Sequence, residues 1–363
     1  MSTFLIAFII SALLSLFIIR YATTHSLDHD LKGVQKFHAR AVPRVGGVAI
    51  FMSVIATSAI ATYRSPGQGY SLLILILCSS IAFFGGVIED LTKRVSAKRR
   101  LLLTMLAAGA GYWLLDARIQ RVDFVVTNFV LLTWVALPLT VVAVAGVANA
   151  VNIIDGFNGL AAVVTMFMLL SLAYVALQVN DTFVLVAAVA VAGAAAGFLV
   201  WNYPAGLIFL GDGGAYFLGF MLAELTVLLV MRNPSVSSWY ALLLVIYPVF
   251  ETLFSVYRRL FVRGRSPGMP DGIHLHSLIF RRIVVWAAGR SDDVRALNLR
   301  NSMTSPYLWL LSLLAVIPAS LFWWHTPTLM GFCLLFVVTY VWLYVRIVRF
   351  RSPRWLFIRG RKR

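Results

Sequence analysis

The sequence predicts an all-α, polytopic integral membrane protein. Hydrophobic residues make up 61% of the 363 residues and charged residues only 12%, whereas a soluble domain carries about 25% charged residues. The apolar residues are grouped in runs of about 18 or more, each long enough to cross roughly 30 Å of hydrocarbon as a helix. The alternating ten-residue segments of a transmembrane β-barrel do not occur in this sequence.

The apolar runs predict eleven transmembrane spans. The first has no basic leader and no small-residue cleavage site, so we expect it to be retained in the mature protein. The spans lie near residues 3–20, 45–63, 71–88, 101–115, 125–146, 160–177, 182–200, 214–231, 239–256, 306–324 and 328–345.

The distribution of Lys and Arg predicts the orientation of the spans. The loops alternate between two sides, and all but four of the 31 Lys and Arg residues fall on one side. The positive-inside rule assigns that side to the cytoplasm, which places the N-terminus in the periplasm and the C-terminus in the cytoplasm. The four exceptions are Arg64, Arg118, Arg121 and Arg232.

This topology predicts one transmembrane domain over residues 1–345, followed by a basic cytoplasmic tail over residues 346–363. The formal net charge of +17 is explained by topology and by contact with anionic membrane lipid, so we expect no nucleic-acid partner. A homodimer is compatible with this architecture. The expected cytoplasmic loops are 21–44, 89–100, 147–159, 201–213 and 257–305.

Polar residues that topology does not require gather in five segments on the predicted cytoplasmic side. Five of the fourteen acidic residues lie in these segments, although acidic residues contribute little to orientation. Carboxylate and amide oxygens are hard ligands for Mg²⁺, while Lys and Arg neutralise phosphate and glycines allow the backbone to approach it. The combination suits an anionic diphosphate substrate. The segments are 36–47, 89–100, 149–159, 209–214 and 263–276.

Each segment alone also has a structural interpretation. Gly211-Asp212-Gly213 is compatible with a turn that opens a helix, and Glu89-Asp90 with a solvated ion pair. A secondary transporter of an anionic solute is the alternative function; it predicts ionisable residues near the bilayer midplane. Glu224 is the only acidic residue well inside a span, and a Ser or Thr partner would explain it without transport.

The five motifs, in this order, resemble those of the polyprenyl-phosphate N-acetylhexosamine-1-phosphate transferases, a family related to the phospho-MurNAc-pentapeptide translocases. The resemblance covers residues 32–282. It implies a membrane enzyme that transfers a HexNAc-1-phosphate from a UDP-sugar to undecaprenyl phosphate, with Mg²⁺, or Mn²⁺ in its place, as cofactor. The reaction would be the first step of a surface glycan such as lipopolysaccharide, at the bacterial inner membrane.

The resemblance also implies roles for individual residues. Metal ligands would be Asn152 and Asp212. Phe209 would stack on uracil and Asn158 would hydrogen-bond it, while Asp90 would be a base, an orienting group or a covalent nucleophile. The catalytic set is Asp90, Glu89, Lys98, His274 and His276. The substrate-binding set is His38, Arg44, Asp155, Asn158, Phe209 and Arg265.

Three positions depart from the pattern of that family. Glu89 replaces the first Asp of an Asp-Asp pair, and Ser277 replaces the third His of a His-x-His-His segment. Glu251, near the cytoplasmic end of a span, takes the place of an Asp that many relatives carry.

Overall fold

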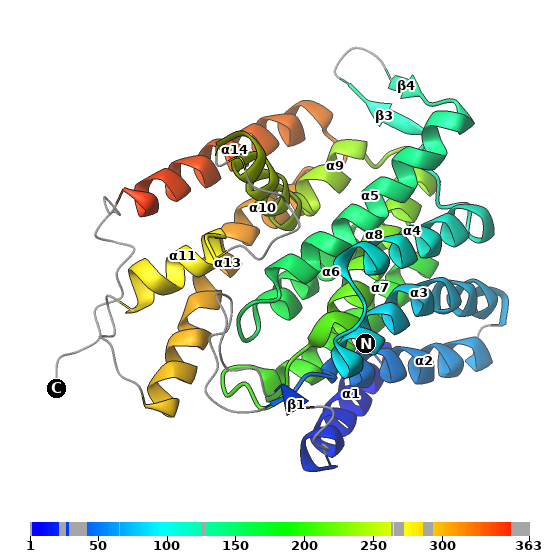
Figure 1. The fold of residues 1–363 in the computed structure, drawn as a ribbon. Coiled ribbons are helices and arrows are strands. Elements are labelled where there is room, and N and C mark those ends of the chain that lie inside the picture. Colours follow the sequence, from blue (N-terminus) through cyan, green and yellow to red (C-terminus); the bar gives the residue numbers. More distant parts are fainter. Residues whose placement is uncertain are drawn as a thin grey trace.

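The computed structural model describes residues 2–21, 27–28, 42–64, 66–124, 128–262, 264, 272–285 and 293–349, and these form a helical bundle (Figure 1). Two short antiparallel strand pairs, β1–β2 and β3–β4, lie outside the helices. The first half of the chain contains α1 (Ser2–Tyr21), β1 (Leu27–Asp28), β2 (Val42–Pro43), α2 (Gly46–Arg64), α3 (Pro66–Thr92), α4 (Ala97–Leu114), β3 (Arg121–Asp123), β4 (Asn128–Val130), α5 (Thr133–Ile154) and α6 (Leu160–Gln178). The second half contains α7 (Thr182–Asn202), α8 (Gly211–Arg232), α9 (Ser238–Leu244), α10 (Ile246–Tyr257), the π-helical turn η2 (Arg258–Val262), α11 (Leu275–Ile279), the π-helical turn η3 (Phe280–Val284), α13 (Val294–Leu321) and α14 (Thr326–Val348).

The helices confirm a multi-pass membrane protein. Nine helices of the described chain are long and apolar enough to span a bilayer, and the pair α9–α10 makes ten when taken as one span. The remaining expected span, near residues 101–115, corresponds to α4, whose first turn carries Lys98, Arg99 and Arg100. Only residues 101–114 are then free for the hydrocarbon, fewer than the ~20 that a straight span needs.

The span expected at 125–146 is wrong in its boundaries. Residues 121–123 and 128–130 form the β3–β4 pair, and α5 begins at Thr133 and continues to Ile154. The segment 122–132 is rich in Val and Phe, and the apolar pattern of so short a run fits a strand as well as a helix. The loop expected at 147–159 is consequently helical as far as Ile154, which places Asn149 and Asn152 on the last turns of α5.

Two other expected loops are also shorter than predicted. The connection between α3 and α4 is only residues 93–96. The loop expected at 257–305 contains η2, α11, η3 and the first turns of α13. Helix α13 begins at Val294, well before its apolar part. Polar residues in this first part, including Asn301 and Ser302, are buried.

Helix α8 is the centre of the bundle. Every residue from Gly211 to Val230 is buried, and α8 packs against α3, α5, α2 and α6. Glu224, midway along α8, is fully buried against Gly111 of α4, and within the described residues its carboxylate has no hydrogen-bond partner. The expected Ser or Thr partner of Glu224 is therefore not found in that part of the chain.

Helix α1 packs along α7, as the Gly193-xxx-Gly197 spacing predicts. A Cβ atom on Gly193 would lie 2.5 Å from the Phe4 carbonyl oxygen, and one on Gly197 would lie 2.3 Å from that of Phe8. Small residues at this spacing allow the two backbones to approach closely.

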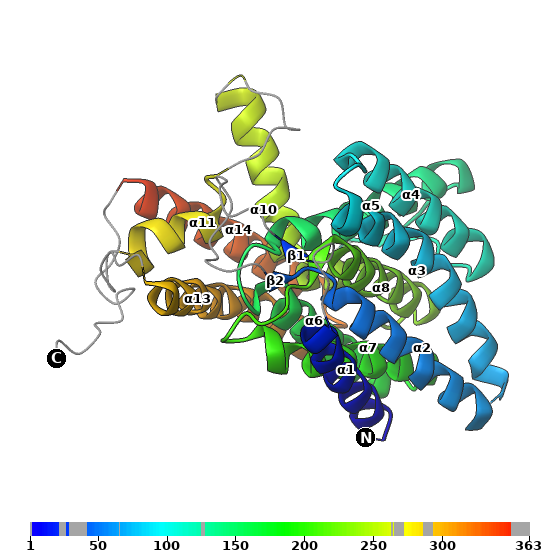
Figure 2. The same cartoon turned by 60° about the horizontal axis from the view of Figure 1, so that its bottom comes forward.

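Helices α9 and α10 form a span that is bent by 69°. Pro248 lies four residues after Leu244, where its ring would clash with the Leu244 carbonyl group of a continuous helix and its nitrogen could not donate to it. The bend directs α10 away from the other helices (Figure 2).

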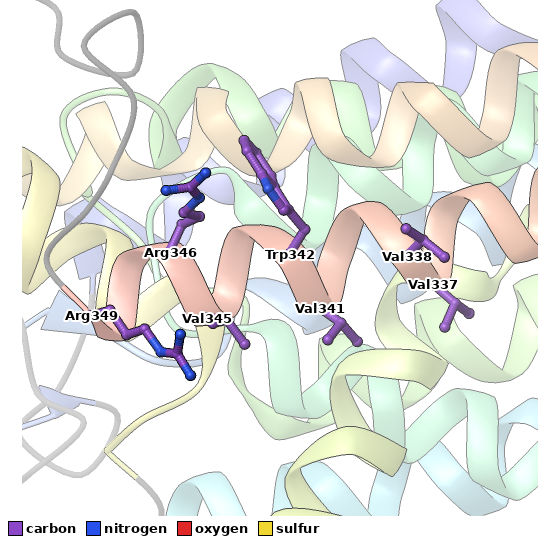
Figure 3. Close-up of a pocket in the computed structure, with 7 residues that line it drawn as sticks. All are labelled: Val337, Val338, Val341, Trp342, Val345, Arg346 and Arg349. Carbon is purple, nitrogen blue, oxygen red and sulfur yellow. The ribbon is translucent and has the colours of Figure 1, made fainter.

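A hollow of about 510 Å³ follows one face of α14 (Figure 3). Its described lining is apolar except at the C-terminal end of the helix, where Arg346 and Arg349 lie. Apolar helix faces with basic ends are typical of helices that contact lipid. The described lining residues are Val337, Val338, Val341, Trp342, Val345, Arg346 and Arg349.

Glycines let α2 and α3 approach the first turn of α8. A Cβ atom on Gly47 would lie 2.2 Å from the Gly214 nitrogen, and one on Gly86 would lie 2.5 Å from the Gly213 nitrogen. Neither contact can relax by rotating a side chain, because both partners are backbone atoms.

We expect Gly86→Ala to lower the free energy of unfolding by about 1–3 kcal/mol or more, since the added methyl overpacks a backbone contact. Gly109→Ala on α4 is the matched control, because nothing lies within 4 Å of the added Cβ atom. Thermal unfolding of both variants in detergent tests the expectation. Equal unfolding temperatures for the two variants would contradict it.

Candidate active site

Asp212 lies in the first turn of α8, at the convergence of five elements. The preceding Gly211 has φ +76°, and a Cβ atom there would lie 2.2 Å from the Arg44 carbonyl oxygen. Only glycine combines this left-handed backbone with so close an approach. The motif therefore presents a carboxylate at a helix N-terminus, where the helix dipole favours negative charge.

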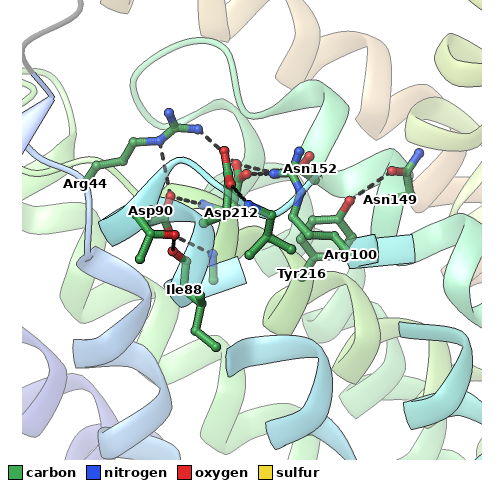
Figure 4. A network of polar contacts seen from close by, with 12 residues as sticks. Arg44, Ile88, Asp90, Arg100, Asn149, Asn152, Asp212 and Tyr216 are labelled. Carbon is green, nitrogen blue, oxygen red and sulfur yellow. Dashed lines mark hydrogen bonds and ion pairs between the residues drawn. The ribbon is translucent and has the colours of Figure 1, made fainter. Parts of the chain in front are cut away.

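Three side chains from other elements bind the Asp212 carboxylate (Figure 4). Arg44, just before α2, donates from Nη2 to Oδ1 at 2.9 Å, and Asn152 of α5 donates from Nδ2 to the same oxygen at 3.0 Å. Arg100, in the first turn of α4, forms an ion pair with Oδ2. Asp212 is 5% exposed, so these contacts compensate for most of its lost hydration.

Asp90, in the last turn of α3, binds the backbone of α8. Its Oδ1 accepts from the Asp212 N–H and its Oδ2 accepts from the Gly213 N–H, both at 2.9 Å. Arg44 Nε lies 3.4 Å from Asp90 Oδ1, so one guanidinium bridges both aspartates. Asp90 thus caps α8 from a neighbouring helix and fixes the position of Asp212.

Arg100 is a site residue that the sequence analysis did not single out. Its guanidinium lies over the ring of Tyr216, 5.7 Å from the centroid, and the Tyr216 hydroxyl donates to Asn149 Oδ1 at 3.1 Å. The sequence segment Lys98-Arg99-Arg100 does not indicate which cation faces inward. That follows from where α4 begins, at Ala97 with Ser96 as its N-cap.

Two expected catalytic residues lie beside this cluster. Glu89 Oε2 accepts from the Val95 N–H at 2.7 Å, so this carboxylate orders the connection between α3 and α4. Lys98 is exposed in the first turn of α4. Their catalytic roles stay predictions.

Asp155 ends α5 and lies close enough to Arg44 to sense its charge. Burial raises the pKa of Asp155 from its ordinary value of 3.8 to about 7, and the Arg44 charge opposes this rise. The carboxyl group is therefore substantially protonated in the folded chain at mildly acid pH.

His274 and His276 form a second group at the start of α11. Their rings are stacked, with centroids 5.2 Å apart, and His276 lies edge-on to Phe157 at 5.6 Å. A Cβ atom on Gly156 would lie 3.4 Å from His276 Nε2. The histidines therefore meet the 155–159 connection, which follows the helix that carries Asn152.

The two expected uracil contacts, Phe209 and Asn158, have different surroundings. Phe209 is partly exposed, and its backbone pairs with Pro43 and Gly46. Asn158 is 4% exposed, and its Nδ2 lies 3.3 Å from the Pro204 carbonyl oxygen and 3.2 Å from Ser302 Oγ. Its amide thus joins α13 to the connection before α8, and its contact with uracil stays a prediction.

Two expected substrate-binding residues, His38 and Arg265, lie outside the described residues.

The oxygen ligands expected for a metal are adjacent. Asn152 and Asp212 come from two helices, and the Asn152 Nδ2 atom lies 3.0 Å from Asp212 Oδ1. Mg²⁺ commonly takes one or two protein oxygens and completes its shell with water and phosphate. Groups of three or more His, Cys, Asp and Glu residues suited to a metal do not occur in the described ranges. The donor set fits a metal that is shared with a phosphorylated substrate.

The sequence relationships agree with this geometry. Residues 72–230 match glycosyl transferase family 4. The chain is 30% identical over 257 residues to the probable undecaprenyl-phosphate N-acetylglucosaminyl 1-phosphate transferase of Bacillus subtilis, covering 68% of each chain. It is 29% identical over 292 residues to the undecaprenyl-phosphate α-N-acetylglucosaminyl 1-phosphate transferase of Thermotoga maritima, covering 78% of this chain and 81% of the other.

A more distant relative is the phospho-N-acetylmuramoyl-pentapeptide-transferase of Caldicellulosiruptor bescii, 28% identical over 54% of this chain and 63% of its own. The protein belongs to glycosyl transferase family 4 and is a multi-pass membrane transferase. Asp90, Asn152 and Asp212 all lie within the residues that match this family.

We expect Arg100→Ala to lower the free energy of unfolding by about 1–3 kcal/mol, because it removes one partner of a buried carboxylate. Lys98→Ala, two residues earlier and exposed, is the matched control. Adding Asp212→Asn to Arg100→Ala should recover part of the loss, since the uncompensated charge disappears. Thermal unfolding of the variants measures these differences, and equal effects at positions 98 and 100 would refute the pairing.

The raised pKa of Asp155 predicts a pH dependence of stability. Between about pH 4 and pH 7 the unfolded chain releases this proton while the folded chain keeps it, so folding stability falls as the pH rises through this window. We expect the unfolding temperature of wild type, relative to Asp155→Asn, to decrease between pH 5 and pH 8. Asp116→Asn, whose side chain is 76% exposed, is the control. A difference that does not change with pH would contradict the expectation.

Proposed function

We propose that the protein transfers a HexNAc-1-phosphate from a UDP-sugar to undecaprenyl phosphate, releasing UMP and forming undecaprenyl-diphosphate-HexNAc. The observation that carries the proposal is the convergence of Asp212, Asn152 and Asp90 with two arginines at one end of α8. Carboxylate and amide oxygens beside guanidinium groups are suited to a metal-bound diphosphate. The names of the two bacterial relatives described above support the same donor and acceptor classes.

The reaction forms one phosphorus–oxygen bond and breaks another. An oxygen of the acceptor phosphate attacks the β-phosphorus of the UDP-sugar, and the bond from that phosphorus to the oxygen of the leaving UMP breaks. Such a transfer needs positioning and charge neutralisation more than covalent chemistry by the protein. Arg44 and Arg100 would exchange part of their contact with Asp212 for contact with the substrate phosphates.

Asn152 and Asp212 would hold Mg²⁺, or Mn²⁺ in its place, which neutralises phosphate charge when bound. Asp90 would act mainly through Asp212, because both its oxygens bind the backbone of α8. The acceptor phosphate is largely ionised near neutral pH, with a second pKa of about 6, so little is asked of a general base. A covalent phospho-Asp90 intermediate is the competing mechanism.

The polar cluster lies at the ends of its helices, which supports an enzyme acting at a membrane face. Asp90 and Asn152 lie in last turns, and Arg100 and Asp212 in first turns. We assign this face to the cytoplasm of a bacterial inner membrane. The proposed topology has eleven spans, with the short α4 counted as one, in one catalytic domain over residues 1–345, the N-terminus periplasmic and the C-terminal tail cytoplasmic. A transporter would instead place its ionic site near the bilayer midplane. The carboxylate at that level of α8 is Glu224, which is separate from the cluster around Asp212.

UMP release in detergent tests the function, with undecaprenyl phosphate, Mg²⁺ and a panel of UDP-HexNAc donors. We expect Asp212→Asn to lower the rate at least about 100-fold, because the metal loses its charged ligand. We expect a comparable loss for Asp90→Asn, since an amide accepts at only one of the two positions used on α8.

Asp116→Asn is the matched control, because that carboxylate pairs with Arg118 at an exposed site. Full activity of Asp212→Asn would reject the assignment. Omission of the divalent ion should abolish UMP release, and donor-dependent uptake into vesicles without UMP release would support transport instead.

A further inference from the structure

A buried carboxylate holds the histidine group in place. Glu251 of α10 is 1% exposed, and its Oε1 lies 3.0 Å from His274 Nδ1 and 2.9 Å from the Leu275 nitrogen. Its Oε2 accepts from the Tyr340 hydroxyl at 2.7 Å. An ionised carboxylate only accepts hydrogen bonds, so the proton of this contact lies on His274 Nδ1.

This contact determines which ring nitrogen of His274 is available for a further hydrogen bond. The contact selects the tautomer with its proton on Nδ1 and fixes the direction of the ring, so Nε2 is the nitrogen that this tautomer presents to a ligand. The ring is held on its other side by the stack with His276. His276 in turn contacts Phe157 of the 155–159 connection, which follows Asn152 of the ionic cluster.

Ile273, just before α11, is held between the turn after α10 and α14. Arg258, in the turn after α10, donates to the Ile273 carbonyl oxygen at 2.7 Å and also binds the Tyr344 hydroxyl. Tyr340 and Tyr344 lie one turn apart on α14, so both hydroxyls face this segment. Helix α14 therefore contributes two hydroxyl groups to this region, that of Tyr340 to Glu251 and that of Tyr344 to Arg258.

We propose that Glu251 is a positioning residue that sets the tautomer and orientation of His274 toward the anionic diphosphate, and that Tyr340 of α14 supports it. The inference rests on the proposed function. It assigns to α14, which lies beyond the residues that match the family, a part in the reaction.

A double-mutant cycle on UMP release tests the coupling. Glu251→Gln keeps the size of the side chain but removes its charge, and should lower kcat on the order of 10-fold or more. Glu251→Asp keeps the charge and should recover part of the rate. Because Glu251 acts through His274, Glu251→Gln combined with His274→Ala should be no slower than His274→Ala alone.

Tyr340→Phe provides a milder second variant in case Glu251→Gln does not fold. It removes one hydroxyl and keeps the ring, which packs against Phe250 and Phe254. We expect a loss of severalfold in kcat that also disappears in the His274→Ala background. Tyr257→Phe on α10, 54% exposed, is the matched control and should retain the wild-type rate.

Multiplicative losses in the double variants would overturn the inference, because a purely structural role does not depend on His274. Wild-type rates for both Glu251→Gln and Tyr340→Phe would overturn it as well. Absence of UMP release by the wild-type protein with every donor is a different result: it would reject the proposed function, and the inference with it.

Discussion

The capping of α8 by Asp90 is the interaction on which the rest of the site depends. The first N–H groups of a helix have no partner within the helix, and in a membrane protein they must find one in protein. Here a carboxylate of α3 accepts from two of them, while the carbonyl groups of Phe209 and Leu210 accept from the first N–H groups of α2. Two helix N-termini are thereby satisfied by neighbouring segments instead of by water.

This mutual capping works only because the helices are close together. The glycines at positions 47, 86, 213 and 214 bring the backbones of α2 and α3 onto α8, and a Cβ atom at 47, 86 or 214 would overlap backbone atoms. The same contacts bring Arg44 and Asp90 to Asp212. Glycine-rich sequence beside acidic residues thus serves helix packing first, and the packing creates the concentrated charge that a diphosphate requires.

The charges of the cluster are balanced in a way that favours exchange of partners. Asp90 and Asp212 face Arg44 and Arg100, so two guanidinium groups match the charges of the two aspartates. A diphosphate and a divalent ion bring opposite charges that can replace these contacts pairwise. Burial in apolar surroundings makes an uncompensated charge costly, so under the proposed function we expect the ion and the diphosphate to bind together.

The sequence predicted the elements with strong physical signatures and missed those that depend on register or tertiary burial. Long apolar runs identified the membrane helices, and the convergence of Asp90, Asn152 and Asp212 followed from topology. The sequence pattern could not identify Arg100 as a site residue, because Lys98, Arg99 and Arg100 are equivalent until the first residue of α4 is known. The apolar residues of 121–130 do not recur with the 3.6-residue period of a helix. The polar start of α13 is predicted as a loop, because the burial of Asn301 and Ser302 depends on segments distant in the sequence.

The connection from Asp155 to Gly159 joins the two halves of the site. On one side it follows Asn152, and on the other it contacts His276 through Phe157. Asn158 binds it to α13: its N–H donates to Asn301 Oδ1 at 2.8 Å and its carbonyl oxygen accepts from the Ser305 hydroxyl at 2.6 Å. A segment held at both ends and in the middle has little freedom to move alone. A continuous series of contacts thus runs from Glu251 of α10 through His274, His276 and Phe157 to the segment that follows Asn152, the residue bonded to Asp212.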